Sequence, residues 1–310
     1  MISHALLLIA ALGLTQAPSD DPLIFAPGAI SGGASDAALT LSPDGHVAFF
    51  ERSNRRIYAI MESHLTGKRW SKPKIAPFSG HWLDLESAIA ADGSYLVFAS
   101  NRPAEPGGKP IDGSYYGKVQ IAKGGALWRV DRVGRGWGEP YRLPGTVNIS
   151  SSIYEPSLAA NGDIYFQSAD ADGKAFHLYV ARARAQGFAR AERIDLHGPD
   201  GSSDMDPAIA RDESFLIFSS DRGSASDHHL FIAFRVTGGW SEPRALGANV
   251  NSGSVGDPRL DEAHHRLYFA SGRLAAPSGD TQRDLDAAGE WNNGLSNIWF
   301  VPFDASSWKE

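Results

Sequence analysis

The chain has 310 residues, of which 42% are hydrophobic, and its formal net charge is -7. It contains no cysteine, which excludes disulfides, thiolate zinc sites and cysteine nucleophiles. The basic residues form no stripe or cluster, so the sequence predicts no nucleic-acid partner.

The N-terminal segment Met1–Ala17 has the pattern of a signal peptide. Its apolar run, Ala5–Leu14, is too short to span a bilayer, and Thr15-Gln16-Ala17 is a small-residue cleavage site followed by Pro18. No later stretch is apolar enough for a membrane span. We expect a periplasmic or secreted mature chain of residues 18–310, and the alternative is a buried N-terminal segment.

Five segments of similar pattern follow from about residue 36. Each opens with an acid and a short apolar run, and the opening acids are 50, 69, 51 and 51 residues apart. A turn such as Asp92-Gly93 or Asn161-Gly162 comes next, because Gly and Asn tolerate the positive φ of tight hairpins. Two further runs read as strands. The first ends in Phe50, Phe98, Phe166, Phe218 or Phe269, and the second contains Tyr58, Trp128, Tyr179, Phe231 or Trp299, all of which we expect to be core residues.

Four strands per repeat predict an all-β fold, a single five-bladed β-propeller of four-stranded blades. The blades are expected at about residues 35–80, 84–148, 154–198, 204–251 and 255–308. The last repeat stops before its fourth strand. Asp21-Pro22-Leu23-Ile24 resembles Glu242-Pro243-Arg244-Ala245, which begins the fourth strand of blade four. We therefore predict that residues 22–27 form the outer strand of blade five and close the ring.

The repeat resembles the TolB-like, WD-repeat-like β-propeller family, in its propeller part only. Leu41-Ser42-Pro43-Asp44-Gly45 matches the family's turn, and Phe98-Ala99-Ser100-Asn101-Arg102 and Phe218-Ser219-Ser220-Asp221-Arg222 match its second strand end. The resemblance covers about residues 21–310. It implies a propeller and, since family members are mostly binding or scaffolding modules, a binding function. No catalytic motif is carried over.

A ring of opening acids is expected near the central channel, on the face formed by the linkers into the first strands and the loops after the second strands, which we call the top face. Arginines end four of the second strands on that face. The ring is either a site for a cation, sugar or polar ligand, or a set of structural acid–arginine pairs. Recurrence in every blade favours pairs, because a catalytic group is needed once. The acids are Asp36, Glu86, Glu155, Asp206 and Asp257, and the arginines are Arg52, Arg102, Arg222 and Arg273.

No metal site or cofactor is predicted. Neighbouring residues on a strand point to opposite faces, so His228 and His229 are poorly placed to share one ion. His264-His265 is expected on the opposite, bottom face. Asp170-Ala171-Asp172-Gly173 and Asp284-Leu285-Asp286 have fragments of calcium-loop spacing but lack the distal glutamate.

Two long insertions are expected on the top face, at Pro103–Ala126 in blade two and Leu274–Ser296 in blade five. Both blades flank blade one, whose top loop is short, so the insertions are predicted to border a cleft. Asp36 and Arg52 would form its floor. The tentative ligand-binding residues around them are His81, Trp82, Tyr115, Tyr116 and Trp291. The alternative is that the insertions lie flat or are tolerated surface variation.

The sequence therefore predicts an exported, monomeric, non-enzymatic propeller that binds a protein or an envelope-associated ligand on its top face. Two alternatives remain open. One is a polysaccharide-active enzyme that uses two ring carboxylates as acid and base. The other is a sugar- or metal-binding module of lectin type.

Overall fold

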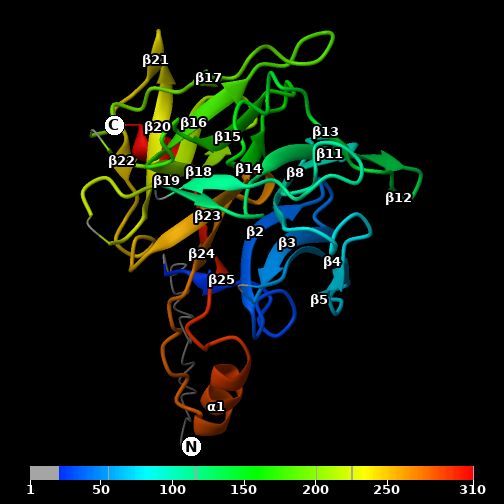
Figure 1. Ribbon diagram of the computed structural model, residues 1–310. Coiled ribbons are helices and arrows are strands. Elements are labelled where there is room, and N and C mark those ends of the chain that lie inside the picture. The colour runs from blue at the N-terminus through cyan, green and yellow to red at the C-terminus, as the bar shows by residue number, and fades with distance from the viewer. Residues whose placement is uncertain (1–20, 55, 116, 200, 225, 310) are drawn as a thin grey trace, which may run out of the picture.

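The computed structural model describes residues 21–54, 56–115, 117–199, 201–224 and 226–309. Five antiparallel sheets are arranged around one axis, and their innermost strands contact one another in a closed ring (Figure 1). The predicted five-bladed β-propeller is confirmed. The predicted signal peptide lies outside the described residues.

Each blade is a meander of four strands, which run in order from the axis outwards. Blade one contains β2 (Ser35–Leu41), β3 (Val47–Ser53), β4 (Tyr58–Thr66) and β6 (Lys74–Ile75). Blade two contains β7 (Asp84–Ile89), β8 (Tyr95–Ser100), β11 (Ala126–Val133) and β13 (Tyr141–Arg142). Blade three contains β14 (Ile153–Leu158), β15 (Ile164–Ala169), β16 (Phe176–Ala181) and β17 (Glu192–Arg193).

The last two blades follow the same plan. Blade four contains β18 (Asp204–Ile209), β19 (Phe215–Ser220), β20 (His229–Val236) and β22 (Arg244–Ala245). Blade five contains β23 (Val255–Asp261), β24 (Arg266–Ser271), β25 (Asn297–Pro302) and β1 (Leu23–Ile24). Short strands extend three of the outer hairpins, namely β5 (Arg69–Trp70), β12 (Gly136–Trp137) and β21 (Gly239–Trp240).

The hydrophobic core lies between the blades. The phenylalanines at the predicted second-strand positions are completely or almost completely buried in all five blades. Each core cluster combines side chains from two neighbouring blades; for example, Phe50 of blade one packs in one cluster with Ile298 of blade five. Burial of this apolar surface holds the blades together.

The two ends of the chain meet in blade five, as predicted. Leu23 pairs with Phe300 and Ile24 with Trp299 in an antiparallel ladder. Phe25 follows, is buried, and packs edge-on against Trp70 of blade one and against Tyr268 and Phe300 of blade five. The N-terminal segment therefore completes the outer edge of blade five and seals the seam between the first and last blades.

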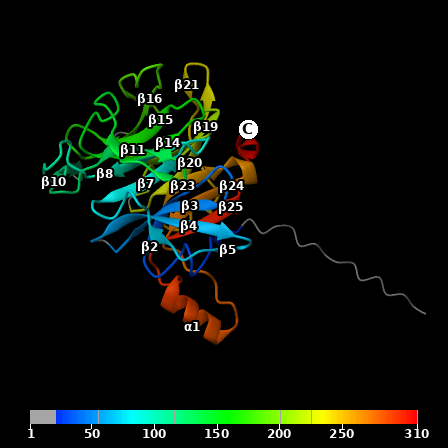
Figure 2. The ribbon, with the colours of Figure 1, turned by 90° about the vertical axis from the view of Figure 1, so that its right-hand side faces the viewer.

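The insertions carry the remaining elements. The blade-two insertion forms a hairpin of β9 (Gly113–Tyr115) and β10 (Lys118–Gln120), and the blade-five insertion forms the helix α1 (Thr281–Glu290). Figures 1 and 2 show α1 standing clear of the sheets. Two 3-10 turns, Glu262–His264 and Ala305–Trp308, complete the described elements. None of the helices described is both long and apolar enough to cross a membrane.

Candidate functional site

Every innermost strand contains a β-bulge at the same position. The strand register shifts there in each blade, and the first bulged residue has a φ near +50°, which is uncommon for residues other than glycine. The bulged residues are Ala38, Glu86, Glu155, Asp206 and Asp257. Four of the five predicted ring acids therefore share one structural position.

The fifth predicted acid, Asp36, does not belong to this ring. Its strand pairs Ala37 with Glu51, as blade two pairs Leu85 with Ala99, so Ala38 is the equivalent of Glu86. Blade one instead contributes Glu51, from β3. The sequence comparison was wrong by two residues here.

The ring side chains bind the backbone of the next blade. Glu86 accepts a hydrogen bond from the N–H of Glu155 at 2.8 Å, and Asp206 accepts one from the N–H of Asp257 at 3.3 Å. Between them, the Gln167 side-chain oxygen accepts from the N–H of Asp206 at 2.7 Å. These bonds satisfy backbone donors that the bulges remove from the sheet ladders. The ring residues thus link successive blades.

One arginine breaks the repeat. Arg259 is two residues beyond the bulged Asp257, where the other blades have the smaller Thr40, Ala88, Ser157 and Ala208. Its guanidinium binds Glu155 with an Nη2–Oε2 distance of 2.5 Å, and the two side chains are only 9% and 2% exposed. Sequence reasoning missed this residue, although a lone arginine among small residues was a visible signal.

Burial shifts the ring carboxyls towards their protonated forms. Loss of solvation, reinforced by the charge of Glu155, raises the pKa of Glu51 to about 8 and that of Asp206 to about 6. The same two causes raise the pKa values of Glu86 and Asp257 well above their usual range. The ring therefore holds fewer negative charges at neutral pH than its composition suggests.

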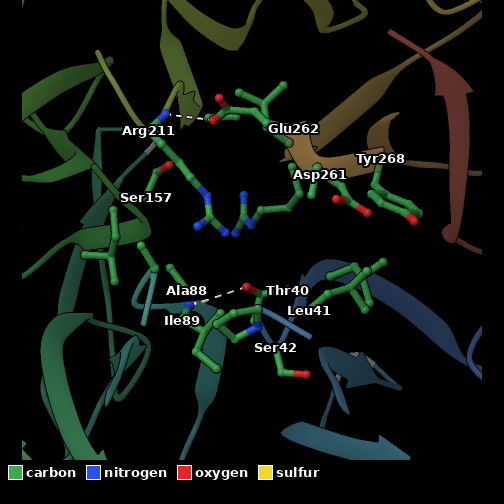
Figure 3. Close-up of a pocket in the computed structure, with 18 of the residues that line it drawn as sticks. Thr40, Leu41, Ser42, Ala88, Ile89, Ser157, Arg211, Asp261, Glu262 and Tyr268 are labelled. Carbon is green, nitrogen blue, oxygen red and sulfur yellow. Dashed lines mark hydrogen bonds between the residues drawn. The ribbon is translucent and has the colours of Figure 1, made fainter. Parts of the chain in front are cut away.

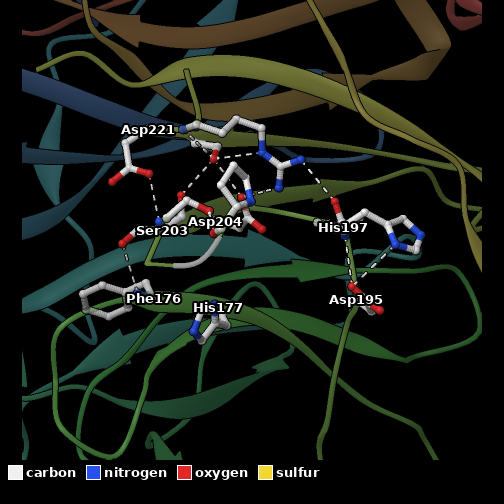
Figure 4. A network of polar contacts seen from close by, with 12 residues as sticks. Phe176, His177, Asp195, His197, Ser203, Asp204 and Asp221 are labelled. Atoms are coloured by element: carbon white, nitrogen blue, oxygen red, sulfur yellow. Dashed lines mark hydrogen bonds and ion pairs between the residues drawn. The ribbon is translucent and has the colours of Figure 1, made fainter. Parts of the chain in front are cut away.

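The repeated arginines pair with a different set of acids. Arg52 binds Asp36, and Arg102 binds Asp84 at 3.0 Å. Figure 4 shows the network in blade four, where Arg222 binds Asp204 at 2.6 Å. The ring acids Glu86 and Asp206 are therefore not the partners of these arginines, because the paired acids lie two residues earlier on the strand.

Each of these arginines also joins its blade to the preceding one. Arg222 donates to the carbonyl oxygen of Leu196 at 3.1 Å, and its guanidinium lies over the rings of Phe218 and Phe231. In blade five, Arg273 has no acid partner among the described residues but donates to the carbonyl of Asn249. Ion pair, carbonyl bond and cation–π contact together give these arginines a structural role.

The residues of the predicted cleft are not brought together. The blade-two hairpin leans onto blade three: Ser114 donates its N–H to Ser152 at 2.7 Å, and the ring of Tyr115 lies 6.5 Å from that of Phe176. The cleft over blade one therefore lacks its predicted blade-two wall. Tyr116 lies outside the described residues.

The other cleft residues occupy separate places. Trp291 ends α1 and packs against the core shared by blades four and five. His81 is exposed and Trp82 half-buried in the linker before β7. Asp36 and Arg52 are engaged with each other.

The described residues contain no group of three or more His, Asp or Glu side chains arranged to hold a metal ion. In the first calcium-like fragment, Asp172 pairs with Lys174 at 2.6 Å. In the second, Asp284 accepts the N–H of Ser278 at 2.9 Å. These acids have local structural partners.

Comparison with known proteins shows the fold. No family model matches the sequence, and no curated protein matches it. A TolB candidate from Agrobacterium tumefaciens is 14% identical and aligns over 87% of this chain and 91% of its own, with a TM-score of 0.51. A GH62 hydrolase in complex with xylotriose is 11% identical over 91% and 96%, with a TM-score of 0.50.

The TolB of Acinetobacter baumannii is 18% identical over 73% of this chain, with a TM-score of 0.47. This chain spans about half of that protein, 46% of its length. Together with the blade arrangement, the likeness to the Agrobacterium TolB candidate defines a TolB-like β-propeller fold. A TolB candidate and a GH62 hydrolase are both similar to this chain in fold, so function has to be argued from the surfaces of this chain.

Proposed function

We propose that this chain is an exported, non-enzymatic binding module that recognises an envelope-associated protein with the two insertions of its top face. The observation that carries the proposal is α1. None of its ten residues is buried, and Leu285 is 64% exposed. A helix of this length is only marginally stable alone in water. A partner that covers Leu285 would bury its apolar side chain and stabilise the helix.

The ends of α1 are held, which gives it a defined position. The Asp280 side chain caps the first turn by accepting the N–H of Arg283, and Trp291 packs on the core at the other end. A helix fixed in this way loses less conformational entropy when it binds a partner than a free segment would. Leu274, in the same insertion, is also 64% exposed.

The blade-two insertion offers a second apolar surface. Val119 and Ile121 are 68% and 73% exposed on or next to β10. Ser114 and Gly117 bind the backbone or side chains of blade three, so this hairpin is also fixed to the propeller. Apolar side chains on protruding, anchored loops are a common form of protein-binding surface.

A polysaccharide hydrolase is the second candidate, because Glu51 and Asp206 combine burial with raised pKa values, as catalytic acids do. The ring carboxyls Glu86 and Asp206, however, each accept a backbone N–H of the next blade. This use favours a structural ring and supports the binding module.

A pull-down from envelope extract separates the two candidates. The baits are the wild type, a variant with both insertions shortened to the blade-four loop length, and Glu86→Gln. We expect one protein to be retained by the wild type and Glu86→Gln and lost from the shortened variant. In a parallel assay, hydrolysis of an envelope polysaccharide by the wild type that is abolished in Asp206→Asn would favour the enzyme instead.

The export component of the proposal rests on the sequence of Met1–Ala17. N-terminal sequencing of the protein recovered from a cell fraction outside the cytoplasm should read from Pro18. Intact Met1 on cytoplasmic protein would contradict export.

A further inference from the structure

A pocket opens on the propeller axis at the bottom face, opposite the insertions. Strands and turns of all five blades line it, including Thr40, Ala88, Ser157, Arg211 and Arg259 (Figure 3). Its cavity volume is about 100 Å³. An engineered cavity of roughly 150 Å³ accommodates benzene, so this pocket has room for a small molecule of several heavy atoms.

Two arginines supply the positive charge of the pocket. Arg259 is buried, and its Nε–H has no hydrogen-bond partner within the described structure, while its Nη2 binds Glu155. An unpaired buried donor lowers stability, so an acceptor that binds the Nε–H of Arg259 would be favourable. Figure 3 shows the Arg211 side chain reaching towards the centre of the pocket.

Arg211, like Arg259, departs from the repeat. It stands five residues beyond the bulged Asp206, where blades two and three have Ala91 and Ala160 and blade five has Glu262. Its side chain makes no ion pair with any residue that the structure describes. A group that occurs once in a five-fold repeat is not needed to build a blade, which points to a specific use.

The acids at the pocket rim are already engaged. Glu262 accepts the backbone N–H of Arg211 at 2.7 Å. Asp261 accepts the N–H of His264 at 3.2 Å and contacts its ring nitrogen at 2.9 Å. Deeper along the axis, the raised pKa values of Glu51 and Asp257 favour their uncharged forms. The charge of Arg259 is balanced by Glu155, so Arg211, which makes no ion pair with any described residue, provides the unpaired positive charge of the pocket.

Aliphatic side chains form part of the remaining wall. Leu39, Ile89, Leu158, Ile209 and Leu260 all line it. Such a wall favours an anion with a hydrocarbon body over a fully hydrated inorganic ion.

We propose that the axial pocket binds a small organic carboxylate, with Arg211 and the Nε–H of Arg259 binding the carboxylate and the leucine and isoleucine side chains contacting its hydrocarbon part. Guanidinium groups match carboxylates well, and such charge-assisted hydrogen bonds are among the stronger ones in proteins. This site is separate from the top face and does not depend on the binding function proposed above.

The test measures binding of butyrate and of its neutral analogue butyramide to the full mature chain by ligand-observed NMR titration. Arg211→Gln removes the exposed guanidinium, and Arg190→Gln is the matched control, because Arg190 is also exposed but does not line the pocket. We expect butyrate to bind the wild type and Arg190→Gln equally, and to bind Arg211→Gln at least about tenfold more weakly. Butyramide should bind the wild type at least about tenfold more weakly than butyrate.

A second variant tests the buried arginine. Arg259→Lys keeps a positive charge near Glu155 but removes the Nε–H, and should weaken butyrate binding while circular dichroism shows an intact fold. The proposal is overturned if butyrate does not bind the wild type, if butyramide binds equally well, or if Arg211→Gln binds butyrate like the control.

Discussion

The Glu86 side-chain carboxyl oxygen of blade two accepts the backbone N–H of Glu155 in blade three, 2.8 Å away. Both residues occupy the bulged position of their strands, with φ values of 51° and 52°. The side chain at one bulge thus satisfies the backbone donor exposed by the next. This relationship explains why acids recur in the ring without requiring a catalytic role.

Replacing Glu86 tests this role. Glu86→Ala should lower the free energy of unfolding by about 1–3 kcal/mol, because the N–H of Glu155 loses its acceptor in a buried place. Glu86→Gln keeps an acceptor oxygen and should lose much less, and urea unfolding measures both. Equal stability of the two variants would contradict the capping role.

The arginine partner in blade four is testable by a double-mutant cycle. Asp204→Asn and Arg222→Met should show a coupling energy of about 1–3 kcal/mol in urea unfolding, since the two side chains form a mostly buried ion pair. The control cycle pairs Arg222→Met with Asp206→Asn, for which we expect about 0.5 kcal/mol or less. A larger coupling in the control cycle would restore the pairing expected from sequence.

Stability should depend on pH through Glu51. Its pKa is raised from 4.5 to about 8, so the folded protein keeps a proton that the unfolded chain releases. The stability that this bound proton contributes is fully present below the pKa of Glu51 in the unfolded chain, and it is lost as the pH rises towards about 8. The raised pKa of Asp206, about 6, acts in the same direction over a lower range.

We therefore expect the Tm of the wild type to fall between about pH 5 and about pH 8, and to fall less in Glu51→Gln. The glutamine side chain of this variant stays uncharged and can still accept the N–H of Glu86. Surface acids such as Asp44 and Asp92 have lowered pKa values, and their opposing effect is confined to more acidic solution. Parallel slopes for both proteins would contradict the assignment.

Ring closure depends on Phe25. Phe25→Ala should cost about 3–5 kcal/mol, because the ring fills the seam between blades one and five. Leu23→Ala is the control: Leu23 lies in the same closing strand but is 56% exposed, so about 0.5 kcal/mol or less is expected. Similar losses in the two variants would show that the seam is not sealed by this side chain.

The sequence predicted the propeller, the core phenylalanines and the closing strand because each leaves a repeated or matching pattern. It misplaced Asp36 because side chains alternate with a period of two along a strand. A shift of two residues keeps the same faces, so alternation alone does not distinguish Asp36 from Ala38 as the equivalent of Glu86. Strand pairing across the bulge resolves this ambiguity.

The position of the blade-two insertion was not predictable in the same way. Its length and its place after β8 follow from the repeat, and both placed it on the top face. Its lean towards blade three depends on single contacts, such as the bond from the N–H of Ser114 to Ser152 and the approach of Tyr115 to Phe176. No repeated pattern encodes such contacts.

The binding role of the insertions is tested most directly by site-specific photo-crosslinking in cells that express the protein. A photoreactive residue is placed at position 285 on α1, at position 119 on β10, and at position 75 on the outer strand of blade one as a control, since Ile75 is also exposed. We predict that positions 285 and 119 form an adduct with the same protein and that position 75 forms none. No adduct from either insertion, or the same adduct from position 75, would contradict recognition through the insertions.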